Sequence, residues 1–150
     1  MPDYLEVTAD KYTFRVAADR LYAPQGVWVQ PQLNHRVRVG LADYLQQSSG
    51  DVAFATVKSA GTRLTAGATF AEVETIKTVL ELPSPVSGAV VEANPALSLT
   101  PEVINQDPYE KGWLAVIEAV DWESDRARLL EPAAYCSVVR SQARKDLKKE

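Results

Sequence analysis

The sequence predicts a mainly β protein, a flattened sandwich of short antiparallel strands with peripheral helices. The strand-like runs are short, rich in β-branched residues, and bounded by glycine or proline. Residues 36–39 alternate cleanly between arginine and valine, as expected for a half-buried strand. With 150 residues, 46% of them apolar, the chain is long enough for one domain with its own core.

Composition and charge exclude several classes of protein. The net charge of −4 argues against a nucleic-acid binder. The start of the chain lacks the basic and apolar regions of a signal peptide, and no run approaches the length of a membrane span. Cys136 is the single cysteine, so no intramolecular disulfide can form, and we expect it to be a small packing residue. We expect a cytoplasmic monomer that binds neither nucleic acid nor membrane.

The first half of the chain predicts a strand, a hairpin, a helix and a further strand. Residues 12–16 alternate as a strand does, and residues 27–30 and 36–39 form a hairpin around the turn at 31–34. Between Gly40 and Gly50 the apolar spacing indicates a short helix, with Gly50 as its left-handed cap. Residues 52–57 then predict the next strand.

A second predicted hairpin carries a lysine at its tip. Residues 68–73 and 79–82 are two apolar, β-branched runs that we expect to pair. Lys77 falls at or beside the turn between them. A lysine in a turn is most often only a solvated residue, but it is also an amine that an acylating enzyme can reach.

The last third of the chain predicts a core strand between helices. Thr100 reads as the N-cap of a helix that starts at Pro101, and Trp113 leads into a strand at 114–117. From about residue 121 the chain is expected to be helical, with Pro132 opening a helix whose basic C-terminal end is solvated. The apolar positions of that helix are Tyr135, Val138, Val139 and Leu147.

The chain lacks the equipment of an enzyme. It has one histidine, His35, in a predicted turn, so a histidine-based triad or a zinc site is not expected. There is no glycine-rich phosphate loop, and the carboxylates are scattered. We therefore predict no catalytic residue and no metal ligand.

Around Lys77 the sequence resembles the lipoyl-lysine segment of glycine cleavage system H proteins. In that family, Glu-Ser-Val-Lys is followed by Pro-Val-Ser-Gly, a valine-rich strand and Asn. This chain has the matching residues at matching spacing, namely Glu74, Thr75, Ile76, Lys77, Pro85, Val86, Ser87, Gly88 and Asn94. The resemblance continues on both sides, through Val39, Gly40, Gly50, Asp51, Phe54, Gly61, Gly67, Asn105, Pro108, Tyr109, Gly112 and Trp113.

The resemblance implies a lipoyl-domain-like fold, a barrel-sandwich hybrid, with lipoic acid on Lys77 as an amide. It places one domain at 1–150, with a lipoyl core at about 27–120 and a C-terminal helical extension at 121–150. Glu74, Thr75, Ile76 and Gly88 are the expected recognition and hairpin residues. The protein would be a non-catalytic carrier whose arm visits partner enzymes. Those partners are a lipoate ligase or lipoyl transferase, glycine decarboxylase, aminomethyltransferase and dihydrolipoamide dehydrogenase.

One departure from the family bears on the pathway. H proteins carry Glu-His-Glu before a tryptophan, beside the cavity that shelters the loaded arm. Trp28 matches that tryptophan, twelve positions before Gly40, but Gln25, Gly26 and Val27 precede it. The loss of both acids and the histidine resembles the H-protein-like lipoate-binding proteins of sulfur oxidation, which work with a heterodisulfide-reductase-like complex. Two pathways therefore stay open, aminomethyl transfer in glycine cleavage and sulfur transfer. For the first, the missing acids predict slow turnover.

Two further alternatives have different chemistry. Biotin carriers share the fold type but flank their lysine with methionines, whereas Ile76 and Thr78 flank Lys77 and Met1 is the only methionine. The other alternative is an interaction module that has lost the modification, which the intact lysine segment argues against.

Overall fold

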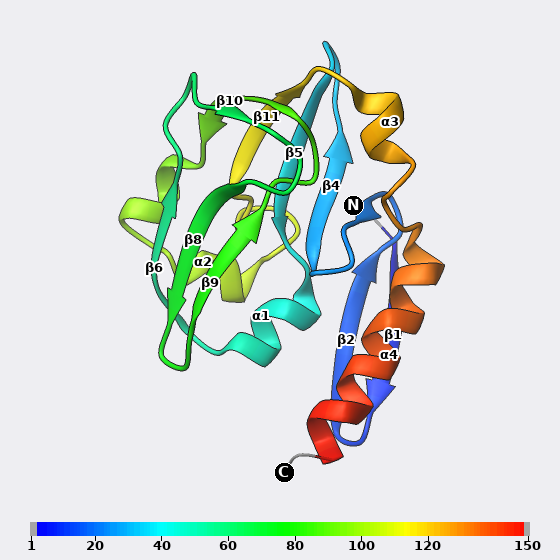
Figure 1. The fold of residues 1–150 in the computed structure, drawn as a ribbon. Helices are drawn as coiled ribbons and strands as arrows, with labels where there is room; N and C mark the ends of the chain where they lie inside the picture. The colour runs from blue at the N-terminus through cyan, green and yellow to red at the C-terminus, as the bar shows by residue number, and fades with distance from the viewer. Residues whose placement is uncertain (1–2, 149–150) are drawn as a thin grey trace.

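The computed structural model describes residues 3–148, and its strands form three antiparallel sheets (Figure 1). A six-stranded sheet has the order β3-β4-β5-β11-β10-β7, a three-stranded sheet has the order β6-β8-β9, and β1 pairs with β2 alone. None of these sheets closes into a barrel within residues 3–148. The strands are β1 (Tyr4–Ala9), β2 (Tyr12–Ala17), β3 (Leu21–Tyr22), β4 (Val27–Pro31), β5 (Arg36–Leu41), β6 (Val52–Val57), β7 (Arg63–Leu64), β8 (Thr69–Thr75), β9 (Val79–Pro83), β10 (Gly88–Ala93) and β11 (Ala115–Ala119).

The helices are short except for the last. They are α1 (Asp43–Ser49), the 3-10 turn η1 (Pro95–Ser98), α2 (Val103–Gln106), α3 (Trp122–Arg126) and α4 (Pro132–Lys148). The prediction of a mainly β fold with antiparallel sheets, peripheral helices and a C-terminal helix is confirmed. None of the helices in residues 3–148 is long and apolar enough to cross a membrane.

The main core lies between the six-stranded and three-stranded sheets. Inward-facing residues from both contribute to one buried cluster, including Val29 and Ile117 from the first and Ala71 and Val73 from the second. Alternation along each strand explains this arrangement, because every second side chain points to the same face. In β5, Val37 and Val39 are buried, whereas Arg36 is exposed, as the sequence pattern predicted.

One helix start differs from the prediction. Thr100 does not cap a helix, because α2 begins at Val103 after a turn and its N-cap residue is Glu102. The Thr100 hydroxyl instead donates to the backbone carbonyl of Ala96 at 3.1 Å. The preceding turn η1 brings that carbonyl within reach, and the hydroxyl is used there rather than at the helix N-terminus.

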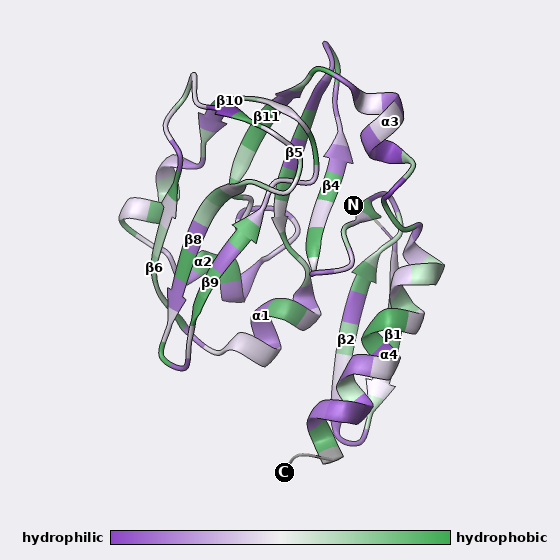
Figure 2. Ribbon diagram, viewed as in Figure 1, coloured by the Kyte–Doolittle hydropathy of each residue, from purple (hydrophilic) through white to green (hydrophobic). Residues whose placement is uncertain are grey.

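A second apolar cluster joins the two ends of the chain. Helix α4 packs on the β1–β2 hairpin, and Phe14 and Val16 of β2 are buried with Tyr135 and Val139 of α4. Figure 2 shows the apolar stretches of α4 beside those of β2. The rings of Tyr135 and Tyr22 stack with centroids 4.3 Å apart, which ties this cluster to the six-stranded sheet.

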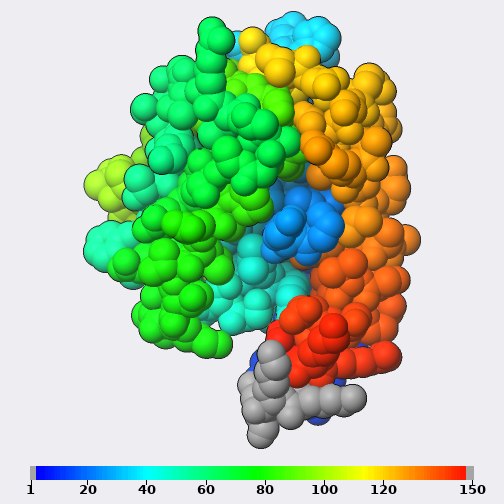
Figure 3. All heavy atoms as spheres, viewed as in Figure 1, coloured from blue at the N-terminus to red at the C-terminus, as the bar shows by residue number. Residues whose placement is uncertain are grey.

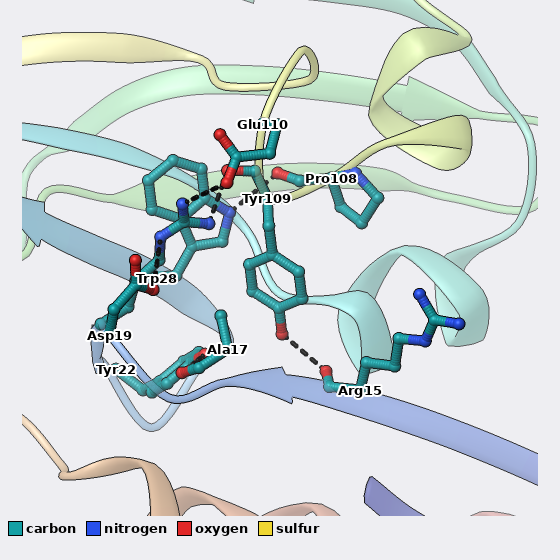
Figure 4. Close-up of polar contacts among 9 residues, drawn as sticks. Arg15, Ala17, Asp19, Tyr22, Trp28, Pro108, Tyr109 and Glu110 are labelled. Atoms are coloured by element: carbon teal, nitrogen blue, oxygen red, sulfur yellow. Dashed lines mark hydrogen bonds and ion pairs between the residues drawn. The ribbon is translucent and has the colours of Figure 1, made fainter. Parts of the chain in front are cut away.

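Arg20 fixes the β1–β2 hairpin to the rest of the protein. Its guanidinium is buried, lies 4.5 Å from the centroid of the Trp28 ring, and donates to Glu110 at 2.9 Å and to the carbonyl of Tyr109. Figure 4 shows the same region, where the Tyr109 hydroxyl donates to the carbonyl of Arg15 at 2.7 Å. A buried charge needs such partners, so this cluster fixes where the hairpin sits.

Candidate cofactor-attachment site

Lys77 lies at the exposed tip of the β8–β9 hairpin, as the sequence predicted (Figure 1). The hairpin is paired along its length, from Thr69 opposite Pro83 to Glu74 opposite Val79. β6 pairs with the other edge of β8, so the strand that leads to Lys77 is hydrogen-bonded on both sides. The lysine therefore stands on a stiff support rather than on a free loop.

The hydroxyl of Thr75 organises the tip. It accepts hydrogen bonds from the backbone N–H of Lys77 at 3.1 Å and of Thr78 at 3.0 Å. It also donates to the carbonyl of Ser49 at 2.6 Å. One buried hydroxyl thus satisfies two donors of the turn and links the turn to the end of α1.

The end of α1 forms a platform under the lysine. The backbone N–H of Ile76 donates to the carbonyl of Asp51 at 3.0 Å, and the Lys77 ammonium donates to the carbonyl of Ser48 at 3.2 Å. Gly50 has a φ of 93°, and a Cβ there would lie 3.2 Å from Cδ of Lys77. A residue larger than glycine would crowd the lysine stem, so Gly50 serves both the helix end and the site.

The side chain of Asn105 stabilises this platform through three hydrogen bonds. Its side-chain amide donates to Gln46 at 3.0 Å and to the carbonyl of Gly50 at 3.2 Å, and its oxygen accepts from the N–H of Val52 at 2.9 Å. The sequence showed Asn105 only as part of the resemblance, with no pattern that linked it to Lys77. Its contacts make it a residue that positions the lysine platform.

We expect the variant Thr75→Val to loosen the tip. Valine keeps the shape but removes the acceptor for the two turn N–H groups, and each lost bond costs on the order of 1 kcal/mol. The melting temperature should fall by several degrees, on the order of 2–4 °C per kcal/mol for a chain of this size. Amide exchange at Lys77 and Thr78, measured by NMR, should become faster. Thr75→Ser is the matched control, since it restores the hydroxyl, and equal exchange in both variants would contradict this role.

The structure brings four of the five predicted site residues together. Glu74 is exposed on the outer face of β8, opposite Val79, and Ile76 is exposed beside Lys77. Gly88 lies elsewhere, at the start of β10 in the six-stranded sheet, paired with Ala119 of β11. Its contacts in the structure are with the backbone of β11, not with the lysine hairpin.

The residues before Gly88 form a fixed turn. The backbone N–H of Ser87 donates to the buried carboxylate of Asp125 at 2.8 Å, and the Ser87 hydroxyl accepts from the N–H of Ala66 at 2.9 Å. The Ser84 hydroxyl donates to the carbonyl of Val86 at 2.6 Å. Ser84 and Ser87 therefore stabilise the connection from β9 to β10. This structural role accounts for the spacing between Lys77 and Gly88 in the sequence.

A cleft of about 680 Å³ opens beside Lys77. Figure 3 shows the hollow between the green tip of β8–β9 and the red end of α4, with cyan α1 at its floor. Its core side is lined by Gln25, Tyr44, Leu45, Ser48 and Lys77, and its outer side by Tyr12 and Phe14 of β2 and Tyr135, Gln142 and Asp146 of α4. The sequence did not predict this cleft, because its outer wall joins the two ends of the chain.

Gln25, Gly26 and Val27 stand where H proteins carry two acids and a histidine. These positions lie on the core side of the cleft or beneath it. Gln25 lines the cleft and is exposed, while Val27 is fully buried in the main core. Gly26 has a φ of 107°, and a Cβ there would lie 3.0 Å from Leu45. These positions supply no charge to the cleft.

One group on α1 and one on α4 have raised pKa values. Burial raises the pKa of the Tyr44 hydroxyl, and its hydrogen bond to Asp146 raises it further. Burial likewise raises the pKa of the Cys136 thiol, partly offset by Arg140, which fits the predicted packing role. Within residues 3–148, no three His, Cys, Asp or Glu side chains gather where they could hold a metal ion.

A known protein family matches most of this chain. The family model described as "Glycine cleavage H-protein" matches residues 20–142. This chain belongs to the glycine cleavage H-protein family. The glycine cleavage system H protein of Geobacillus thermodenitrificans is 40% identical over 118 residues, which cover 79% of this chain and 91% of the relative. That of Mycobacterium tuberculosis (strain H37Rv) is 40% identical over 125 residues, covering 80% and 93%.

A solved H-protein structure shows the same fold. The crystal structure of the glycine cleavage system H protein from Mycobacterium marinum matches with a TM-score of 0.71 and 30% identity, covering 81% of this chain and 97% of that one. The resemblance found in the sequence is confirmed. The family match covers residues 20–142, so β1 and β2 precede it and the end of α4 follows it.

Trp28 and Gly40, two residues that match H proteins, lie against each other in the structure. Trp28 is fully buried, and a Cβ on Gly40 would lie 2.6 Å from its ring. The Trp28 indole donates to the carbonyl of Pro108 at 2.9 Å. Glycine at position 40 is thus required by the approach of the indole, not by the lysine site.

Proposed function

We propose that this protein is a lipoyl carrier of the glycine-cleavage type, with lipoic acid attached to Lys77 through an amide. The observation that carries the proposal is the placement of Lys77, exposed at the tip of a paired hairpin beside a cleft. Membership of the glycine cleavage H-protein family supports it. The chain itself would not be a catalyst, because the partner enzymes carry out the chemistry.

The residues at the tip fit a long acyl arm. The lysine amine is reachable, and its stem runs over Gly50 toward Ser48 on the cleft wall. The cleft mixes aromatic and amide side chains, which suits an apolar arm that is joined to the lysine through a polar amide. When attached, the cofactor supplies a dithiolane that accepts a group and electrons.

The chain's own residues would present and position that arm. Thr75 and the α1 platform fix the direction in which Lys77 leaves the hairpin. Glu74 and Ile76 offer a charge and an apolar side chain to the enzyme that attaches the cofactor. A tethered arm also has a high effective concentration at a docked partner. The proposed partners are a lipoate ligase or lipoyl transferase, glycine decarboxylase, aminomethyltransferase and dihydrolipoamide dehydrogenase.

Intact mass spectrometry after co-expression with a lipoate ligase tests the attachment. One lipoyl increment is expected, and peptide mapping should place it on Lys77. A biotinyl increment in the presence of a biotin ligase, or an unmodified chain, would overturn the proposal. The first outcome would point to a biotin carrier and the second to an unmodified interaction module.

A second candidate is sulfur transfer by the same arm with a heterodisulfide-reductase-like complex. The uncharged set of Gln25, Gly26 and Val27 favours it, because a sulfur cargo has no ammonium to stabilise. A reconstituted glycine–bicarbonate exchange assay separates the two candidates. Exchange at the rate of an ordinary H protein supports glycine cleavage, whereas reduction by dihydrolipoamide dehydrogenase without exchange supports sulfur transfer.

A further inference from the structure

The cleft beside Lys77 contains a carboxylate from the far end of the chain. Asp146 lies near the end of α4 and lines the cleft together with Lys77. It falls outside residues 20–142, so the family match assigns it no role. No sequence pattern linked Asp146 to the lysine, which lies 69 positions earlier.

Two neighbours hold the Asp146 carboxylate in place. The Tyr44 hydroxyl, from α1 on the opposite side of the cleft, donates to one of its oxygens. Gln142, one turn earlier on α4, donates to the other oxygen at 3.4 Å. These two hydrogen bonds fix the orientation of the carboxylate at the cleft lining.

Attachment of an acyl group to Lys77 changes the charge of the cleft. Among the described residues that line it, Lys77 and Asp146 are the only charged side chains. Acylation removes the lysine charge. The lining then passes from one positive and one negative group to a single negative group, which attracts a cation in this partly desolvated space.

We infer that Asp146 is the residue that holds a positively charged cargo of the arm in the cleft, in place of the acids missing before Trp28. The inference rests on the proposed function and names the specificity of that site. It assigns Asp146 a positioning role through charge, with no part in bond making. A neutral cargo of the same size would gain nothing from it. Slow turnover in glycine cleavage was predicted because the sequence showed no carboxylate near the arm. Since Asp146 supplies one, slow glycine–bicarbonate exchange is instead expected of the variant Asp146→Asn.

Two stable forms of the arm test this without partner enzymes. Lipoylated protein in a Cys136→Ala background is reduced and alkylated with 2-bromoethylamine, which gives a cationic arm, or with 2-bromoethanol, which gives a neutral arm of similar size. Mass spectrometry confirms lipoylation and alkylation. The readout is the difference in melting temperature between the two arms within each variant, which cancels any general loss of stability.

The cationic arm is expected to melt about 2–4 °C above the neutral arm in the parent, with a smaller difference at high salt. Asp146→Asn should abolish the difference, and Asp146→Glu should retain it. Glu123→Gln, a change on α3 away from the cleft lining, is the matched control and should also retain it. The inference about Asp146, but not the proposed function, would be overturned by either of two results. One is the same melting temperature for both arms in the parent, and the other is an unchanged difference between the arms in Asp146→Asn. Absence of the lipoyl increment would remove the proposed function together with it.

Discussion

The variant Lys77→Arg is expected to receive no lipoyl group while keeping the melting temperature of the parent chain. Arginine has a comparable stem and can still donate to the carbonyl of Ser48, so the platform contacts survive. Its guanidinium stays protonated at any accessible pH and offers no lone pair to an activated acyl group. The measurement is intact mass after co-expression with a lipoate ligase, and the expected change is complete loss of the increment.

Lys58→Arg is the matched control for Lys77→Arg. Lys58 is exposed just after β6, and the substitution removes an amine there in the same way. The increment should persist in this control, and exposed substitutions of this kind stay within about 0.5 kcal/mol of the parent in stability. A lipoyl increment on Lys77→Arg would mean that a different lysine carries the cofactor.

The variant Gly88→Ala is expected to lose about 3 kcal/mol of stability, at the upper end of overpacking costs. A Cβ on Gly88 would lie 1.9 Å from the backbone oxygen of Glu118, a distance that no rotamer can relieve. The β10–β11 pairing must therefore open at its first position, Gly88 opposite Ala119. In thermal unfolding, the melting temperature should fall by roughly 6–12 °C.

Gly67→Ala separates this clash from the ordinary cost of replacing a glycine. Gly67 has a φ of 96°, but a Cβ there meets nothing within 4 Å. Only the backbone strain remains, about 1–2 kcal/mol. A Gly88→Ala protein as stable as Gly67→Ala would show that the strand shifts easily. Once folded, Gly88→Ala should accept lipoate normally, because Gly88 contacts β11 rather than the lysine hairpin.

The sequence was most informative where local chemistry decides structure. The lysine hairpin was predicted at 68–73 and 79–82, and it occupies 69–75 and 79–83, because glycine and proline bound two β-branched runs. The helix from Pro132 was predicted for similar reasons, since its opening proline and its apolar spacing are local features. The buried positions Tyr135 and Val139 also follow from that spacing.

What depends on distant parts of the chain was not predictable. Apolar periodicity shows that α4 buries one face, but it cannot show that the partner is the β1–β2 hairpin. Asp146 therefore remained an acid on a solvated helix end until the structure placed it in the cleft. The same limit applies to Asn105, whose contacts with α1 and Val52 span more than fifty positions. The Thr100 prediction was wrong because a competing carbonyl, that of Ala96, lies within reach.

The packing of α4 on the β1–β2 hairpin also bears on the order of events during synthesis. The β1–β2 hairpin leaves the ribosome well before α4, so their contact joins segments that lie far apart in the sequence. Contacts of such large sequence separation form late, after local pairings such as β8 with β9. We expect the nascent chain to present Lys77 on a finished hairpin before the cleft has its outer wall. During that interval the side of Lys77 that faces the cleft would be open, while the α1 platform already lies beneath it.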